Sequence, residues 1–358
     1  MGMRTLIRFL LVFCSAFAID GPAQQSAAPA QPSGSHSIVL DVVVTDKSGK
    51  PVSGLQQEDF SLLDDKTAVK MTAFHATAET ADAADSPRQV VFVVDAVNGS
   101  SQTVSFEKQQ LQKMLQQDSG HLAIPTTLAI LTDSGSQIQS QPTLNGNDLA
   151  NALNESTALR SLPPSRGLYA GNDRIQVSMH ALQDVTRYAA SQPGRKFVIW
   201  LSAGWPLLTG PRVDLTLTQK QTLFRTVVAI SQQLREARLT LYAVDPLGMN
   251  DAGTLGTVRY GGFLKGVTAP TKVEYGNLAL QVLAIQSGGL VLNSSNDLQK
   301  MIATTLTDAK AYYTLSFDAP PADHADEFHA LEVKVDKPGL TARTRTGYYA
   351  EPYQAAGR

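Results

Sequence analysis

An aspartate, Asp95, closes the unbroken apolar run Val90–Val94. Four of the five residues in this run are valines, whose β-branched side chains favour strands, so the run predicts a fully buried central strand. An acidic side chain where such a strand emerges is expected in the crevice where open α/β sheets bind their ligands. Two interpretations fit Asp95: it is a metal ligand, or its carboxylate accepts hydrogen bonds from amides of the following loop.

Further polar and aromatic residues are predicted at the same edge of the sheet. Asp245 follows the apolar run Leu241–Val244 and is expected to emerge beside Asp95, where it either supports a neighbouring loop or shares a cation. Trp205 and Leu207 lie in the loop after another apolar run. If they are exposed, they are the kind of anchors that dominate protein interfaces, and the alternative is that they fold back onto the core.

Ser202 lies in a segment, Trp200-Leu-Ser-Ala-Gly204, that is similar to the nucleophile elbow Gly-x-Ser-x-Gly. The elbow is a strained turn that needs a small residue two positions before the serine. Trp200 is too large for that position, so the sequence favours a polar loop over a catalytic serine. The six histidines are scattered without zinc spacing, and the chain has no glycine loop of the phosphate-binding type. We therefore predict that the protein is not an enzyme.

The hydrophobic pattern predicts the elements that position these residues. From residue 88 to 309, short apolar runs alternate with longer stretches of helical spacing, such as Leu223, Val227, Ile230 and Leu234. This alternation predicts a doubly wound, mostly parallel α/β sheet covered on both faces. Segments 37–78 and 310–350 show strand alternation instead. Each is too short to form a stable sheet alone, so we predict that they pair into one small β-sandwich-like domain.

Composition and the chain ends indicate an exported protein. Residues 1–18 are typical of a signal peptide: Arg4 and Arg8 precede a short apolar run, and Ala16-Phe17-Ala18 fits a cleavage site. Residues 19–36 are predicted to be a disordered linker and residues 351–358 a tail. The only cysteine lies inside the predicted signal, so no disulfide is expected in the processed protein. We predict that this product is periplasmic or extracellular and has no membrane span.

A net charge of −2 with no basic cluster argues against a nucleic-acid partner. Segment Gly248–Lys272, rich in glycine, predicts a long flexible loop.

Six segments, in this order, resemble the von Willebrand factor A-related proteins of the acidobacterial type. They are Asp41–Phe60, Val93–Asn98, Gly194–Gly204, Leu241–Asp245, Tyr312–Phe317 and Lys337–Tyr349. Each segment is weak alone, but their order over nearly all of the processed chain is specific. The resemblance implies an A-domain core whose strand-end crevice holds a divalent cation in many relatives.

In those relatives the cation ligands are an Asp-x-Ser-x-Ser motif, a threonine from a later loop and an aspartate after the fourth strand. Oxygen ligands of this kind suit Mg²⁺ or Ca²⁺. In this chain Asp95 matches the first aspartate, but Val97 and Gly99 occupy the two serine positions, and Ala203 occupies that of the second aspartate. We therefore predict that the A-domain fold is kept and the cation is lost.

The sequence as a whole predicts a non-catalytic, adhesion-type protein that binds another protein and needs no cofactor. Its recognition surface is expected at the strand-end crevice around Asp95, Ser202 and Trp205. The alternative is an adhesion module that binds Mg²⁺ or Ca²⁺ through Asp95, with Asn98 and Ser100 as ligands at shifted spacing. A secreted serine hydrolase that uses Ser202 is the least favoured alternative.

Overall fold

The apolar run that ends at Asp95 forms the central strand of a seven-stranded, mostly parallel sheet in the computed structural model. The structure describes residues 37–77, 87–156, 168–208, 214–245 and 260–350. The predicted signal peptide, linker and C-terminal tail lie outside these residues.

The strand order of the seven-stranded sheet is β11-β10-β9-β5-β6-β7, with β8 beside β6. The strands are β5 (Arg88–Asp95), β6 (His121–Thr132), β7 (Gly135–Ile138), β8 (Thr143–Asn145), β9 (Arg195–Leu201), β10 (Leu239–Val244) and β11 (Val291–Leu292).

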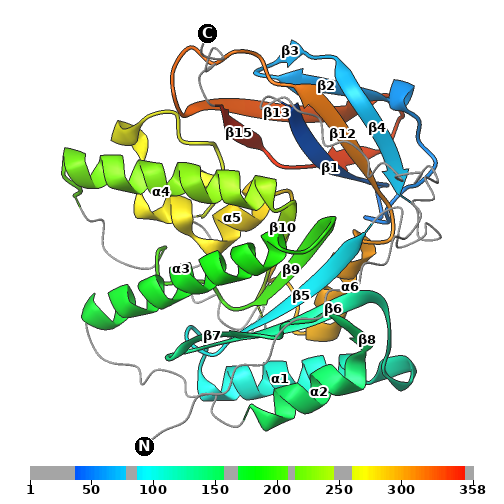
Figure 1. Cartoon of the computed structure of the whole chain (residues 1–358), viewed down its shortest axis with the longest axis vertical. Helices are drawn as coiled ribbons and strands as arrows, with labels where there is room; N and C mark the ends of the chain where they lie inside the picture. Colours follow the sequence, from blue (N-terminus) through cyan, green and yellow to red (C-terminus); the bar gives the residue numbers. More distant parts are fainter. Residues whose placement is uncertain (1–36, 78–86, 157–167, 209–213, 246–259, 351–358) are drawn as a thin grey trace, which may run out of the picture. The chain divides into compact units, whose positions relative to one another are not determined.

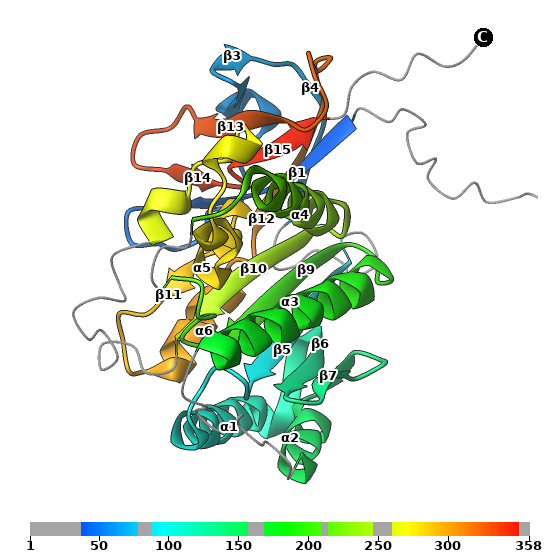
Figure 2. The same cartoon turned by 90° about the vertical axis from the view of Figure 1, so that its left-hand side faces the viewer.

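Helices cover both faces of this sheet (Figures 1 and 2). Successive side chains of a strand point to opposite faces, and β5 follows this rule: Val90, Phe92 and Val94 belong to one hydrophobic cluster, while Val91 and Val93 belong to the other. The first cluster includes α1 (Ser101–Leu115), α2 (Gly146–Glu155) and α6 (Leu298–Thr307). The second includes α3 (Leu168–Ala190), α4 (Leu217–Glu236) and α5 (Leu280–Gln286).

Strands from both sides of this α/β region form a β region, at the top of Figure 1. One of its sheets has the order β14-β1-β12-β4 and the other β15-β13-β2-β3. Alternate side chains of both sheets meet in a common cluster that includes Leu40, Phe60 and Leu315. The strands are β1 (Ser37–Thr45), β2 (Phe60–Asp64), β3 (Thr67–Ala68), β4 (Met71–Thr77), β12 (Tyr312–Asp318), β13 (Glu327–Val335), β14 (Thr341–Arg343) and β15 (Gly347–Ala350).

The segment predicted as a long flexible loop, Gly248–Lys272, is only partly described. Its described part is not an open loop, because it forms the 3-10 helices η4 (Tyr260–Phe263) and η5 (Pro270–Lys272). Val267, between them, is buried in the α/β core. Its backbone N–H donates to the Tyr349 hydroxyl at 3.2 Å, which ties the segment to β15. No helix among the described residues is long and apolar enough to cross a membrane.

Candidate functional site

The predicted site lies at the carboxyl end of the central strand, β5. Strand β5 has β6 on one side and β9 on the other, and both neighbours run parallel to it. Asp95 ends β5 and Ser202 follows β9, so both lie at the carboxyl ends of adjacent strands, where open α/β sheets bind their ligands.

Asp95 is completely buried, and both oxygens of its carboxylate accept hydrogen bonds from the protein. Its Oδ1 accepts hydrogen bonds from the backbone N–H groups of Val97 and Asn98, each at 3.0 Å. Its Oδ2 accepts from Asn98 Nδ2 at 2.8 Å and from Trp200 Nε1 at 3.0 Å. A carboxylate offers about four lone-pair positions, so these donors occupy the group. This is the arrangement that the loop-amide interpretation of Asp95 describes.

Asn98 and Ser100, the alternative cation ligands, both make hydrogen bonds with other groups of the protein. The Asn98 amide also donates to Ser178 Oγ on α3 at 2.8 Å, which joins the loop to that helix. The Ser100 hydroxyl accepts from the Thr103 backbone N–H at 3.1 Å and caps α1. The Ser100 hydroxyl is thus engaged in the helix cap, whereas the Asn98 Oδ1 atom is buried without a hydrogen-bond partner among the described residues.

The interpretation of Trp205 and Leu207 as exposed anchors is wrong. Trp205 is only 3% exposed and makes an edge-to-face contact with Trp200, with ring centroids 5.3 Å apart. Leu207 is partly buried and packs against the same cluster. The physical reason is that an indole buries a large apolar area, and a second indole at the strand end offers it an aromatic partner. The chain's own side chains therefore fill the crevice that was predicted to be a recognition surface.

Ser202 is buried and belongs to a turn. Its hydroxyl oxygen accepts a hydrogen bond from the Gly204 backbone N–H at 3.1 Å. Gly204 has a φ of +106°, which side-chain-bearing residues rarely adopt. This pattern is a serine turn that closes the loop after β9.

A buried glutamate that sequence reasoning missed, Glu107, lies near the same edge. It is 1% exposed on α1, and its Oε2 has no hydrogen-bond partner among the described residues. Burial, together with the charges of Asp95 and Asp245, raises the pKa of Glu107 well above its usual value. Asp245 therefore lies within electrostatic reach of the site, as predicted for this strand end. The signal was available in the sequence, because Glu107 continues the helical spacing of the apolar residues Val104, Leu111 and Leu115.

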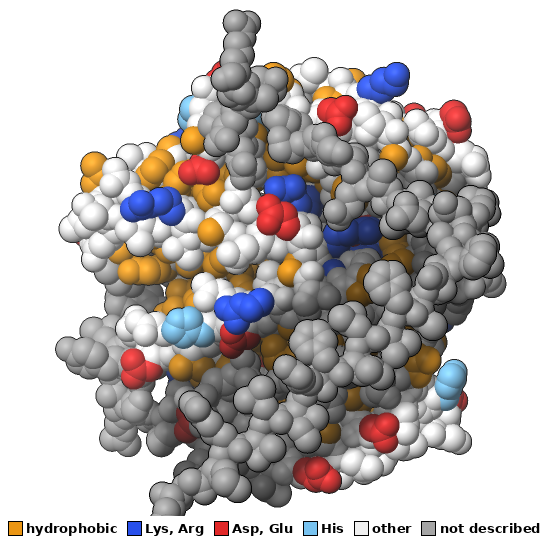
Figure 3. Space-filling view, viewed as in Figure 1, with side chains coloured by type: hydrophobic (Ala, Val, Ile, Leu, Met, Phe, Trp, Pro, Cys, Tyr) orange, Lys and Arg blue, Asp and Glu red, His pale blue; other side chains and the backbone are white. Residues whose placement is uncertain are grey.

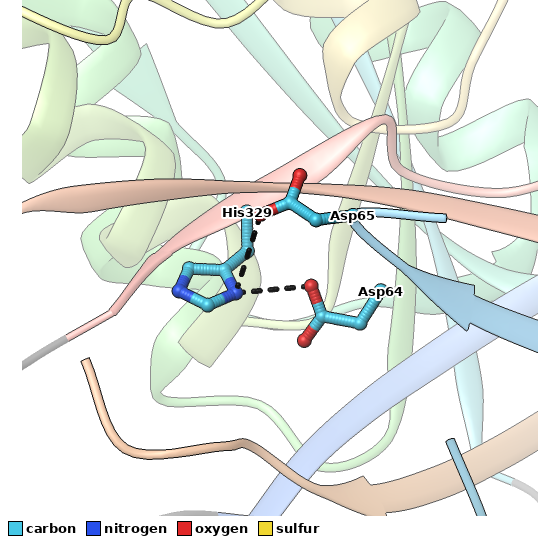
Figure 4. Close-up of side chains that lie close together, drawn as sticks. All are labelled: Asp64, Asp65 and His329. Carbon is cyan, nitrogen blue, oxygen red and sulfur yellow. Dashed lines mark hydrogen bonds and ion pairs between the residues drawn. The ribbon is translucent and has the colours of Figure 1, made fainter. Parts of the chain in front are cut away.

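A second group of polar side chains lies in the β region (Figure 4). His329 Nδ1 lies 3.0 Å from Asp64 Oδ1 and 3.7 Å from Asp65 Oδ2. The Tyr348 hydroxyl donates to Asp64 Oδ2 at 2.7 Å, and its ring stacks on the imidazole. One nitrogen and two carboxylate oxygens of this kind can ligate a metal. In the structure they connect β2, β13 and β15, and sequence reasoning missed them because β13 pairs with β2 across a long separation in the chain.

No family model and no curated protein matches the chain. Among solved structures, it is similar to the PilB minor pilin of Streptococcus sanguinis, with 14% identity, 62% of each chain covered and a TM-score of 0.37. It is also similar to the pilus adhesin SpaC of Lactobacillus rhamnosus GG, with 8% identity and a TM-score of 0.36, over 84% of this chain and 43% of that one. For human Sec24c the identity is 10% and the TM-score 0.32, over 75% and 44%. The match spans less than two thirds of each of these chains, and likenesses of this size carry no argument about function.

Proposed function

We propose that the chain is an exported, non-catalytic protein-recognition module with a doubly wound sheet of the von Willebrand factor A type. Numbered along the chain, β5, β6, β7, β9, β10 and β11 have the spatial order 3-2-1-4-5-6, which supports the doubly wound proposal, with β7 antiparallel to β6. The family resemblance of the sequence supports the recognition role, and the predicted signal peptide supports export. The observation that supports the proposal is the Asp95 carboxylate, whose oxygens accept hydrogen bonds from Val97, Asn98 and Trp200.

Because the crevice is filled, we place the recognition surface on a groove of about 440 Å³ between α4, η5 and the loop before β13. Phe224 and Pro270 give the groove apolar walls, while Arg225, His324 and Asp326 surround them with charged and polar groups. Apolar walls with a few polar groups are typical of binding clefts. A groove of this chemistry fits a segment of a partner protein.

A photo-crosslinking amino acid at Ala325, in the groove, tests this proposal in the parent cell envelope. We expect it to capture a discrete protein partner, and an excess of unlabelled wild-type protein to suppress that capture. The Arg225→Ala, His324→Ala double variant is expected to compete at least tenfold less well. A crosslinker at Lys113, which is exposed on α1, is the matched control. Equal capture from both positions, or equal competition by the double variant, would remove the groove from the proposal.

One observation favours a second candidate, a cation-dependent adhesion module. Glu107, Asp95 and Asp245 bring three carboxyl groups within electrostatic reach of one another, and the Glu107 Oε2 atom lacks a partner among the described residues. A cation there would compensate the buried charge. It would also have to displace the Asn98 and Trp200 donors from Asp95, so we rank this candidate second.

A further inference from the structure

Arginine side chains gather at the junction between the α/β region and the β region. A narrow pocket there is lined by Arg235, Arg238, Arg345 and Asp41, among others, and its interior has room for only about 10 Å³; we name it the arginine pocket. In the space-filling view, basic side chains lie in the middle of the face, at the level where the two regions meet (Figure 3). The three arginines come from the end of α4, the turn before β10 and the segment between β14 and β15.

Cationic side chains outnumber carboxylates in and around the arginine pocket. A fourth guanidinium, that of Arg195, is 1% exposed and lies over the rings of Phe197 and Tyr312, at 4.4 and 4.6 Å from their centroids. Asp41 accepts hydrogen bonds from Arg238 and lies 3.9 Å from Arg195 Nε. A second carboxylate, that of Glu236, is 63% exposed and 3.5 Å from Arg235. The ammonium group of Lys196, a residue that is 3% exposed, also lies within electrostatic reach of Arg238 and Asp41, so five cationic groups outnumber these two carboxylates.

Several of these guanidinium donors are unused. Arg195 Nε and Nη1 and Arg235 Nε are buried without a hydrogen-bond partner among the described residues. Arg345 is 8% exposed and lines the pocket. Burial and the charge of Arg235 lower the pKa of Arg345 to about 10, although Asp41 acts in the opposite direction. Buried donors without acceptors are costly, and an anion would satisfy them.

We propose that the arginine pocket binds a phosphoryl group. The cationic groups exceed Asp41 and Glu236 in charge, and a phosphoryl group, which carries up to two negative charges, offsets more of this excess than a single carboxylate does. The fork of an arginine also matches the oxygens of a phosphate in a bidentate way. The interior of the pocket is narrow, so the phosphoryl group binds at its mouth, where the side chains of Arg235 and Arg238 are 19% and 33% exposed. A free phosphate ion and a lipid headgroup share this chemistry.

Calorimetric titration of the processed chain with inorganic phosphate, against chloride at equal ionic strength, tests the proposal. We expect one bound phosphate per chain, and an affinity at least tenfold weaker in Arg345→Met. This variant should fold, because it replaces a buried charge with an unbranched apolar side chain. Arg187→Gln is the matched control, since Arg187 of α3 does not line the pocket and its side chain is 75% exposed. If Arg345→Met does not fold, Arg235→Gln takes its place with the same expected loss.

Sedimentation with phosphatidylcholine vesicles, with and without phosphatidic acid, separates the two sources of the phosphoryl group. Binding of free phosphate without vesicle binding assigns the ion, and vesicle binding that Arg345→Met abolishes assigns the lipid. The proposal is overturned if neither ligand binds the wild-type protein. It is equally overturned if Arg345→Met binds as tightly as Arg187→Gln.

Discussion

At the scale of single residues, Asp95 shows how a strand-end carboxylate becomes a structural group. Its donors come from the loop after β5 and from β9, and Asn98 extends the network to α3. A cation site needs carboxylate oxygens that are free to turn toward the ion. Here the Trp200 indole N–H occupies one oxygen, so the residue that resembles a metal ligand in the sequence links three elements instead.

Glu107 gives a prediction at the same scale. Because its folded pKa is raised, its neutral form stabilises the fold fully below its usual pKa of 4.5, and this stability is lost as the pH rises from there through the folded pKa. Glutamine keeps the shape and cannot ionise. We expect Glu107→Gln to match the wild type near pH 4 and to exceed its free energy of unfolding by about 1 kcal/mol or more at pH 7. Urea unfolding at both pH values measures this, and a variant that is less stable at pH 7 would contradict it.

At the scale of elements, the turn before β9 depends on Gly194. Its φ is +71°, and a Cβ atom there would lie 1.8 Å from the carbonyl oxygen of Pro87. That same oxygen accepts from the Arg195 backbone N–H at 3.0 Å, which aligns β9 with β5. We expect Gly194→Ala to lower the free energy of unfolding by about 3 kcal/mol or more, since backbone strain and a steric clash add.

Gly49→Ala is the matched control for this prediction. Gly49 has a φ of +82°, but a Cβ atom there would meet nothing within 4 Å. It should therefore cost only the backbone term, about 1 kcal/mol. Equal losses in the two variants, measured by denaturant unfolding, would show that the contact with Pro87 does not constrain the turn.

The sequence predicted those elements whose hydrophobic pattern is unambiguous. The run before Asp95 and the helical spacing of Leu223, Val227, Ile230 and Leu234 correspond to β5 and α4. Helices α2 and α3 were not predicted individually. Burial of Trp205 could not be deduced from its type, because a tryptophan suits an interface as well as a core, and only the position of Trp200 decides between them. The arginine pocket combines residues from opposite ends of the chain, which no local pattern reveals.

At the scale of the whole molecule, the two regions share their cores. Tyr349 of β15 belongs to the α/β cluster and packs edge-to-face on Phe224 of α4, with centroids 6.0 Å apart. Val43 of β1 and Tyr312 of β12 belong to the cluster on the other face of the sheet. Residues 36–358 accordingly form one compact unit. Any ligand that binds the native crevice should therefore stabilise the whole unit.

This linkage makes thermal unfolding a test of cation dependence. A ligand at about 100 times its dissociation constant stabilises the native state by about 2.7 kcal/mol, which raises the melting temperature by several degrees. Because protein donors saturate Asp95, we expect millimolar Mg²⁺ or Ca²⁺ to change the melting temperature by less than about 1 °C relative to EDTA at equal ionic strength. Asp95→Asn should be equally insensitive to the cation, although less stable. A rise of several degrees in the wild type that Asp95→Asn abolishes would instead favour the cation-dependent adhesion module, because only a cation held at this carboxylate would depend on its charge.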